Sequence, residues 1–172
     1  MQIKYISFMK ITKLLILLTV VAFISSLRLT AQKADFNGTW KIDRTKSTLV
    51  EYTPVLTRID IRINGDSLLT ERYYDTGDGQ EHPFTENLTL DGKEYSITIY
   101  EMPRKTKASW SEQDGSLIIE STITITRDSG TADFISKESW TIDKTNNILT
   151  ISFKNKMAEN DSEGAFIFNK EK

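Results

Sequence analysis

The chain has 172 residues, of which 38% are hydrophobic and 27% are charged, and its formal net charge is −2. This length predicts one globular domain, and the composition excludes a generally disordered chain. The absence of cysteine excludes disulfides, thiolate chemistry, a lipidated N-terminal cysteine and cysteine-ligated zinc or iron–sulfur sites, so stability must come from a packed core.

The first 31 residues have the composition of an export signal. Three lysines and no acid precede an apolar run of 14 residues, Leu14–Leu27. The run is shorter than the roughly 20 residues that span a bilayer. We predict a signal peptide over residues 1–31, cleaved after Ala31, and a secreted or periplasmic protein. The alternative is an uncleaved N-terminal anchor, which Arg28 at the end of the run favours.

Removal of this segment makes the remaining domain, residues 32–172, more acidic. Four of the 22 lysines and arginines and none of the 24 acids lie in the signal, so the net charge changes from −2 to −6. Phosphate binding needs clustered cations, so we expect no nucleic-acid partner. The one tight basic cluster, Pro103–Lys107, is interpreted as a solvated turn and strand edge. We expect no stable membrane insertion once the signal is removed.

Hydrophobic alternation with a period of two dominates the domain. The three isoleucines of Leu56–Ile63 share one face, and charged residues occupy the other. Glu94–Glu101 and Ser116–Arg127 alternate in the same way. Such alternation predicts half-buried antiparallel strands.

Turn-forming pairs separate these segments. Asn64-Gly65, Asp91-Gly92 and Asp114-Gly115 accept positive φ and close tight hairpins, and Asn146-Asn147 can do the same. Looser connections are expected at residues 75–83, 101–105, 127–133 and 156–164.

The pattern predicts an all-β fold of about eight to ten strands. No segment has a helical period, although Lys46–Pro54 has room for one irregular turn. Short sequential hairpins favour an antiparallel up-and-down meander barrel over a two-layer sandwich. A barrel of this size usually encloses a pocket.

Three predicted strands carry a carboxylate among apolar residues. If these faces point inward, the acids need partners or a wet cavity, because an unpaired buried charge is costly. They are then polar anchors for a ligand, or else they lie at a barrel end where the side chain reaches water. The sets are Glu138 with Phe134, Trp140 and Ile142, Glu86 with Phe84, Leu88 and Leu90, and Glu71 with Leu69 and Tyr73.

Catalytic motifs are not found. The chain has one histidine, His82, which lies in a predicted loop and is interpreted as a solvent residue. The segment Asp75–Gly79 is interpreted as a turn, since it lacks the spacing of a calcium loop. We therefore predict no enzyme, no metal site and no cofactor, with catalysis by inward carboxylates as a minor alternative.

The segment Gly38–Lys41, with the sequence Gly-Thr-Trp-Lys, resembles the start of the first strand in the calycins, the lipocalins and fatty-acid-binding proteins. The chain is also similar to lipocalin-like domains of exported bacterial proteins through Lys46-Ser47, Asp91-Gly92 and Glu138–Trp140. The resemblance implies that Trp40 plugs one end of a barrel and that Gly38 lets the chain turn tightly. Lipocalins place an arginine over this tryptophan, and only Lys170 is positioned to replace it here.

Other family features are missing. Fatty-acid-binding proteins place a helix pair after the first strand, whereas Arg44–Pro54 is too short and too β-like for one. They hold the ligand carboxylate with an Arg-x-Tyr pair, which the last predicted strand, Gly164–Lys170, lacks. No C-terminal helix follows. The resemblance therefore implies the barrel shape more strongly than it implies fatty-acid specificity.

We predict an exported, non-catalytic protein that binds a small hydrophobic or amphipathic ligand inside a calycin-like barrel. The alternative is a protein–protein interaction module with a filled core. The predicted structural plug is Gly38 with Trp40. The predicted ligand-binding residues are Tyr73, Phe84, Glu86, Tyr95, Ile97, Trp110, Phe134, Glu138 and Trp140.

Overall fold

A computed structural model describes residues 33–50, 54–99, 101–127, 130–157 and 160–171. These residues form ten strands and no helix. The strands are β1 (Gly38–Ile42), β2 (Val55–Asn64), β3 (Ser67–Asp75), β4 (Glu81–Thr89), β5 (Tyr95–Ile99), β6 (Met102–Trp110), β7 (Leu117–Arg127), β8 (Gly130–Asp143), β9 (Ile148–Met157) and β10 (Asn160–Lys170).

The predicted signal peptide and its cleavage site lie outside the described residues. Within the described part of the chain, no helix has the length and apolarity needed to cross a bilayer.

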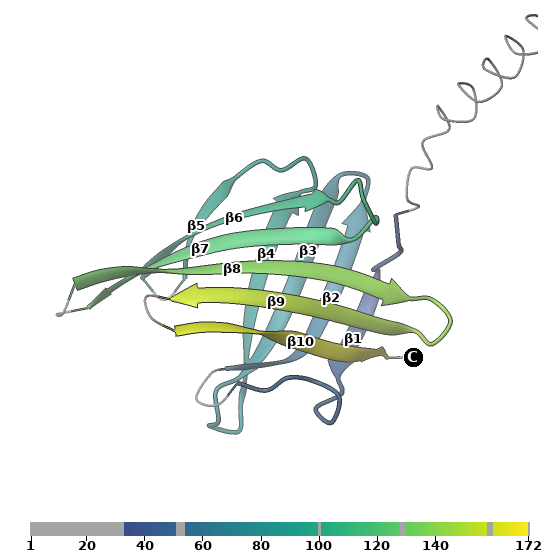
Figure 1. Cartoon of the computed structure of the whole chain (residues 1–172), viewed down its shortest axis with the longest axis horizontal. Coiled ribbons are helices and arrows are strands. Elements are labelled where there is room, and N and C mark those ends of the chain that lie inside the picture. Colours follow the sequence, from purple (N-terminus) through teal and green to yellow (C-terminus); the bar gives the residue numbers. More distant parts are fainter. Residues whose placement is uncertain (1–32, 51–53, 100, 128–129, 158–159, 172) are drawn as a thin grey trace, which may run out of the picture. The chain divides into compact units, whose positions relative to one another are not determined.

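All ten strands belong to one antiparallel sheet with the order β4-β3-β2-β1-β10-β9-β8-β7-β6-β5. Strands that follow each other in sequence are paired, except β4 and β5, which form the two edges of the sheet. In addition, β1 pairs with β10 and thereby joins the two ends of the chain. The sheet nearly closes where the chain leaves β4, because Asp91 bridges to Ser109 and the Gly92 N–H donates to Ala108 O at 2.9 Å. Figure 1 shows the two runs of strands, β1–β4 and β5–β10, on opposite sides of a common interior. The predicted all-β, up-and-down barrel is confirmed.

All four connections expected to be loose are shorter than predicted. β6 begins at Met102, β8 at Gly130 and β10 at Asn160, so residues that are poor strand formers lie inside strands. Pro103, for example, lies in β6 opposite Thr98 of the edge strand β5. The backbone ladders of these long hairpins override local propensity, which is a weak determinant in sheets. Of these four, the connection between β3 and β4 is the longest, residues 76–80. His82, which was expected in this loop, lies in β4.

The contacts among Gly38, Trp40 and Lys170 explain the sequence motif at the start of β1. Trp40 is 1% exposed, and its indole N–H donates to Phe36 O at 2.9 Å. Lys170 Nζ lies 5.1 Å from the centroid of the Trp40 ring. Lys170 is therefore the cation over the indole, as the sequence predicted. Gly38 has a φ of +130°, and a Cβ there would lie 2.7 Å from Lys170 Cε. The backbone conformation therefore favours glycine, and a Cβ there would displace the flexible end of Lys170. The plug role of Trp40 stays a prediction.

The segment after β1 continues along β10 instead of forming a helix pair. Ser47 Oγ donates to Asp43 O at 2.8 Å and accepts the Ile167 N–H at 2.9 Å. The Thr48 N–H donates to Ala165 O at 2.8 Å. Thr48 lies against Gly164, where a Cβ would lie 2.6 Å from Thr48 Cβ. The Lys46-Ser47 motif thus ties this connection to the last strand.

The inward-facing side chains form three levels along the barrel. The closed half is packed and almost fully buried; its members include Trp40, Leu68, Leu88, Ala108, Leu117, Trp140, Leu149 and Phe168. Next comes the polar belt, defined as Thr70, Arg72, Glu86, Arg104, Thr106, Ser121, Ser136 and Glu138. Beyond it lies the open half, whose inward side chains are only partly buried or exposed: Phe84, Ile97, Ile99, Met102, Ile123, Ile125, Phe134 and Met157.

Candidate functional site

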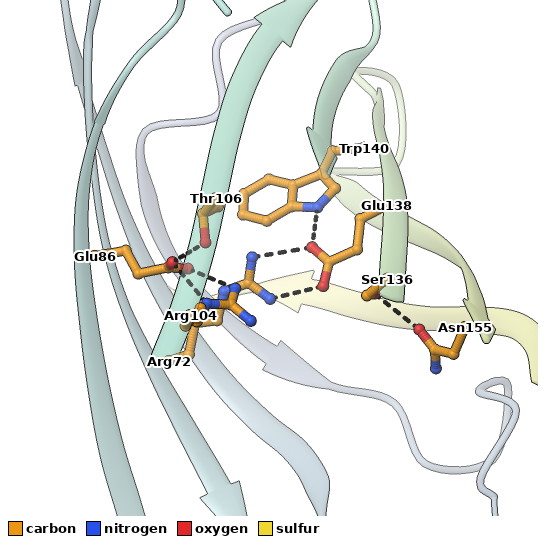
Figure 2. Close-up of polar contacts among 8 residues, drawn as sticks. All are labelled: Arg72, Glu86, Arg104, Thr106, Ser136, Glu138, Trp140 and Asn155. Atoms are coloured by element: carbon orange, nitrogen blue, oxygen red, sulfur yellow. Dashed lines mark hydrogen bonds and ion pairs between the residues drawn. The ribbon is translucent and has the colours of Figure 1, made fainter. Parts of the chain in front are cut away.

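The first element of the polar belt is an ion pair between Arg72 of β3 and Glu138 of β8. Arg72 Nη1 and Nη2 donate to Glu138 Oε1 and Oε2 at 2.8 and 2.9 Å. The Trp140 indole N–H donates to Glu138 Oε2 at 2.8 Å. Arg72 is 2% exposed and the Glu138 side chain 16%. Figure 2 shows the two side chains meeting across the interior with the indole beside them.

A second ion pair lies near the first. Arg104 Nε and Nη2 donate to Glu86 Oε1 and Oε2 at 3.0 and 3.1 Å, and Thr106 Oγ1 donates to Glu86 Oε1 at 2.9 Å. The Arg104 guanidinium carbon lies 5.4 Å from the centroid of the Phe84 ring. This pair links β6 to β4 across the seam where the sheet has no continuous ladder. It therefore helps to close the barrel from within.

The charges of the two pairs influence each other. Burial by itself raises the pKa of Glu138, but the charge and hydrogen bonds of Arg72, with the Trp140 N–H and the charge of Arg104, hold the pKa below its ordinary value. Burial lowers the pKa of Arg72, but the charge of Glu138, with smaller contributions that include Glu86, raises it well above its ordinary value. Arg72 and Glu138 are thus a charged pair at neutral pH.

A neutral polar ladder continues the belt across β8, β9 and β10. Ser136 Oγ donates to Asn155 Oδ1 at 2.8 Å, as Figure 2 shows, and Asn155 Nδ2 donates to Ser162 Oγ at 3.4 Å. Ser136 is buried, whereas Asn155 and Ser162 are only partly buried. The ladder therefore presents uncharged hydrogen-bonding groups toward the open half.

Belt side chains also include polar atoms without partners. Arg72 Nε and Thr70 Oγ1 are buried and have no hydrogen-bond partner among the described residues. Both residues lie on the inward face of β3, two positions apart. A buried donor without a partner is costly and calls for a water or a ligand atom.

The structure places the nine predicted ligand-binding residues in different parts of the barrel. Glu86, Glu138 and Trp140 meet at the polar belt, and Phe84 lies next to it. Ile97 and Phe134 belong to the open half, where Ile97 is 39% exposed. The predicted face-sharing of Glu86 and Glu138 with their apolar neighbours is confirmed by the strand register.

Three other predicted residues lie away from the belt. Tyr95 is at the seam, with its hydroxyl 2.9 Å from Thr89 Oγ1. Trp110 lies in the closed half, 5.9 Å from Phe36 between ring centroids. The assignment of Tyr73 to the interior is wrong: it packs under Arg58 on the outer face, 3.8 Å from the guanidinium carbon to the ring centroid. The face of β3 was misassigned because its inward residues are polar, Thr70 and Arg72. Glu71 faces outward with Tyr73 for the same reason.

Sequence reasoning missed the two arginines. The basic cluster Pro103–Lys107 was interpreted as solvated, which holds for Lys105 and Lys107, but Arg104 is 8% exposed. The missed signal was the need for cations opposite Glu86 and Glu138, since a buried carboxylate is retained only with a partner. Arginine is suited to this because its planar guanidinium binds a carboxylate through two bonds.

The outer face carries a hollow of about 480 Å³ over β6–β9. Exposed lysines surround it, and Ile135, 47% exposed, lies among them. Its charged lining residues are Lys105, Lys107, Lys137, Lys154, Lys156, Glu94 and Glu120. This cationic face contrasts with the acidic charge of the chain as a whole.

No group of three or more histidine, cysteine, aspartate or glutamate side chains within the described part of the chain is arranged to hold a metal ion. Neither the scan of protein-family models nor the search of curated proteins finds a match to this chain. The nearly closed ten-stranded barrel is compatible with a calycin-like fold.

Proposed function

We propose that this protein is an exported, calycin-like barrel that binds a small hydrophobic or amphipathic ligand in its open half without catalysing a reaction. The observation that carries the proposal is the incomplete burial of apolar side chains that face inward beyond the polar belt. Inward apolar groups that stay exposed are stabilised when a ligand removes them from water. Phe84, Ile97 and Phe134 would contact its apolar part.

The polar belt would form the floor of this site. Its arginines and carboxylates are nearly buried and already paired, so the belt ends the apolar volume with a rigid polar surface. An amphipathic molecule would place its polar end there and its chain toward the mouth.

The belt carboxylates support binding over catalysis. A general acid needs a raised pKa, and catalytic groups need a free side to face a substrate. The pKa of Glu138 is instead lowered, and its oxygens accept three hydrogen bonds. Glu86 also accepts three.

The test uses two neighbouring residues on opposite faces of β8. Phe134→Asp would place a charge in the open half, whereas Ile135→Asp would place it on the outer face. We expect the uncharged fluorescent probe N-phenyl-1-naphthylamine to bind the wild type and Ile135→Asp, and to bind Phe134→Asp at least tenfold more weakly. Equal loss in both variants, or no binding to the wild type, would contradict the proposal.

The proposal includes export through a cleaved signal peptide and membership of the calycin-like family. If the signal is cleaved after Ala31, the protein isolated from its own host begins at Gln32, which intact-mass measurement reads directly. A mass that includes residues 1–31 would favour the uncleaved anchor.

The second candidate function is a protein–protein interaction module. The observation that favours it is the outer hollow, whose five lysines outnumber its two glutamates. This charge fits an acidic protein segment, with Ile135 as an apolar contact. We would measure anisotropy of a fluorescein-labelled oligoglutamate peptide with the wild type and with the double variant Lys137→Gln/Lys156→Gln. Binding that is unaffected by the double variant would exclude this face.

A further inference from the structure

The polar belt suggests which head group the open half accepts. Its four charged side chains sum to zero, and each guanidinium is bound to a carboxylate through two hydrogen bonds. The charges of the belt are therefore balanced pair by pair. Arg72 Nε, which is buried without a partner among the described residues, belongs to a guanidinium already neutralised by Glu138.

The wall that β5–β10 form between belt and mouth is also nearly free of charge. On the other side, the inward face of β4 carries His82 beyond Phe84, and its Nε2 lies 2.8 Å from Asp78 Oδ2. The inward positions of β5, β6 and β7 beyond the belt carry Ile97, Ile99, Met102, Ile123 and Ile125. Those of β8 and β9 carry Phe134 and Met157, beside Asn155 and Ser162. In these strands the only ionisable side chain at an inward position beyond the belt is Arg127, exposed at the end of β7.

The polar groups that β9 and β10 offer to a ligand are neutral. Asn155 and Ser162 are only partly buried and are joined by a long hydrogen bond of 3.4 Å. Their amide and hydroxyl can donate to or accept from a hydroxyl or carbonyl group. An anionic head at this level would also approach Glu138, the more exposed of the two belt carboxylates.

We propose that the ligand is an uncharged amphiphile, with a hydroxyl or carbonyl head held by Asn155 and Ser162 and an apolar chain directed toward the mouth. The inference rests on the proposed ligand-binding function. It excludes free fatty acids at neutral pH and alkylammonium ions, because an unpaired charge placed against a neutral, largely buried polar layer loses its hydration without a counter-ion.

The test compares three ligands with the same ten-carbon chain in displacing N-phenyl-1-naphthylamine at pH 8: decan-1-ol, decanoate and decyltrimethylammonium. We expect decan-1-ol to bind at least tenfold more tightly than either ion. Decanoate or decyltrimethylammonium binding as tightly as decan-1-ol would overturn the inference but leave the binding function in place. If neither the probe nor any of the three ligands binds, the proposed function itself fails.

A charge-changing variant tests the role of the belt. Glu138→Gln removes the negative charge opposite Arg72, so the belt gains a net positive charge. We expect the affinity for decanoate to rise at least tenfold relative to the affinity for decan-1-ol. Glu163→Gln, which removes an exposed acid paired with Lys154, is the matched control and should change neither. Unchanged decanoate affinity in folded Glu138→Gln would contradict the assignment.

The head-group contact is tested separately by Asn155→Leu. We expect decan-1-ol affinity to fall five- to tenfold, with the affinity of the probe changed less than twofold. An unchanged affinity for decan-1-ol would overturn the role of Asn155. Should Glu138→Gln fail to fold, as judged by near-UV circular dichroism, the three-ligand comparison on the wild type still decides the inference.

Discussion

The closed half and the open half of the barrel come from the same sequence pattern but differ in packing. In β8, Trp140 is fully buried in the closed half, whereas Phe134, six residues earlier on the same face, is only partly buried. Alternation sets the face on which a side chain lies, and it does not set how deeply that position is covered. The depth of burial depends on the side chains that other strands contribute across the interior. Here the polar belt separates the closed half from the open half.

The largest expected effect is on the packed side of this comparison. Trp140→Ala should lower the free energy of unfolding by about 3–5 kcal/mol, because it leaves a cavity and removes a hydrogen bond to Glu138. Phe134→Ala should cost about 1 kcal/mol or less, since its side chain is already partly in water. Urea denaturation at pH 7 measures both. Similar losses in the two variants would mean that the halves do not differ in packing.

The belt between the halves should be the next most sensitive region. Glu138→Gln should cost about 3 kcal/mol, because it leaves the buried Arg72 without a full counter-charge. The same substitution at the exposed Glu163 should cost less than about 0.5 kcal/mol. A cost at position 138 no greater than that at 163 would show that the pair does not stabilise the barrel.

The belt also predicts how stability depends on pH. The pKa of Glu138 in the folded state is below its ordinary value of 4.5. Its contribution is therefore complete above the pKa of the unfolded chain and is lost as the pH falls through the lower folded pKa. The difference in unfolding free energy between the wild type and Glu138→Gln should shrink as the pH falls below about 5. Urea titrations at intervals of pH measure it; a constant difference would contradict the assignment.

Two glycines at opposite ends of the barrel sharpen the comparison further. Gly38 and Gly130 have nearly the same φ, +130° and +128°, but a Cβ meets Lys170 only at Gly38. Gly130→Ala should cost about 1 kcal/mol from backbone strain alone. Gly38→Ala should cost about 1 kcal/mol more, because Lys170 must also move away from Trp40. Thermal denaturation of both variants measures the difference, and equal costs would mean that the contact with Lys170 is not stabilising.

The smallest expected effect is on the cation over the indole. Lys170→Gln should cost about 0.5–1 kcal/mol, the usual range for an exposed cation–π contact. Lys93, whose Nζ lies 5.2 Å from the Tyr95 ring centroid, offers a control away from the closed half. A larger loss for Lys93→Gln would be evidence against a special role of Lys170.

The sequence by itself determined the strands, most of their faces and the tight turns. Each of these is local: alternation is visible within one segment, and Gly65, Gly92 and Gly115 take the positive φ that their turns require. Asn147 does the same without being glycine. The need of Glu86 and Glu138 for partners was also visible, because a carboxylate among apolar neighbours must be paired or hydrated.

Only the tertiary structure decided which partners these were. Arg72 and Glu138 are 66 residues apart, and their contact depends on the curvature that brings β3 opposite β8 across the interior. The sequence did not show which face of β3 points inward, because the buried residues of this strand are polar. Tyr73 was therefore assigned to the interior, and Arg72 was missed. Where a strand carries its charges on the inside, hydrophobic alternation cannot identify the face, and only the closed sheet shows which charges meet.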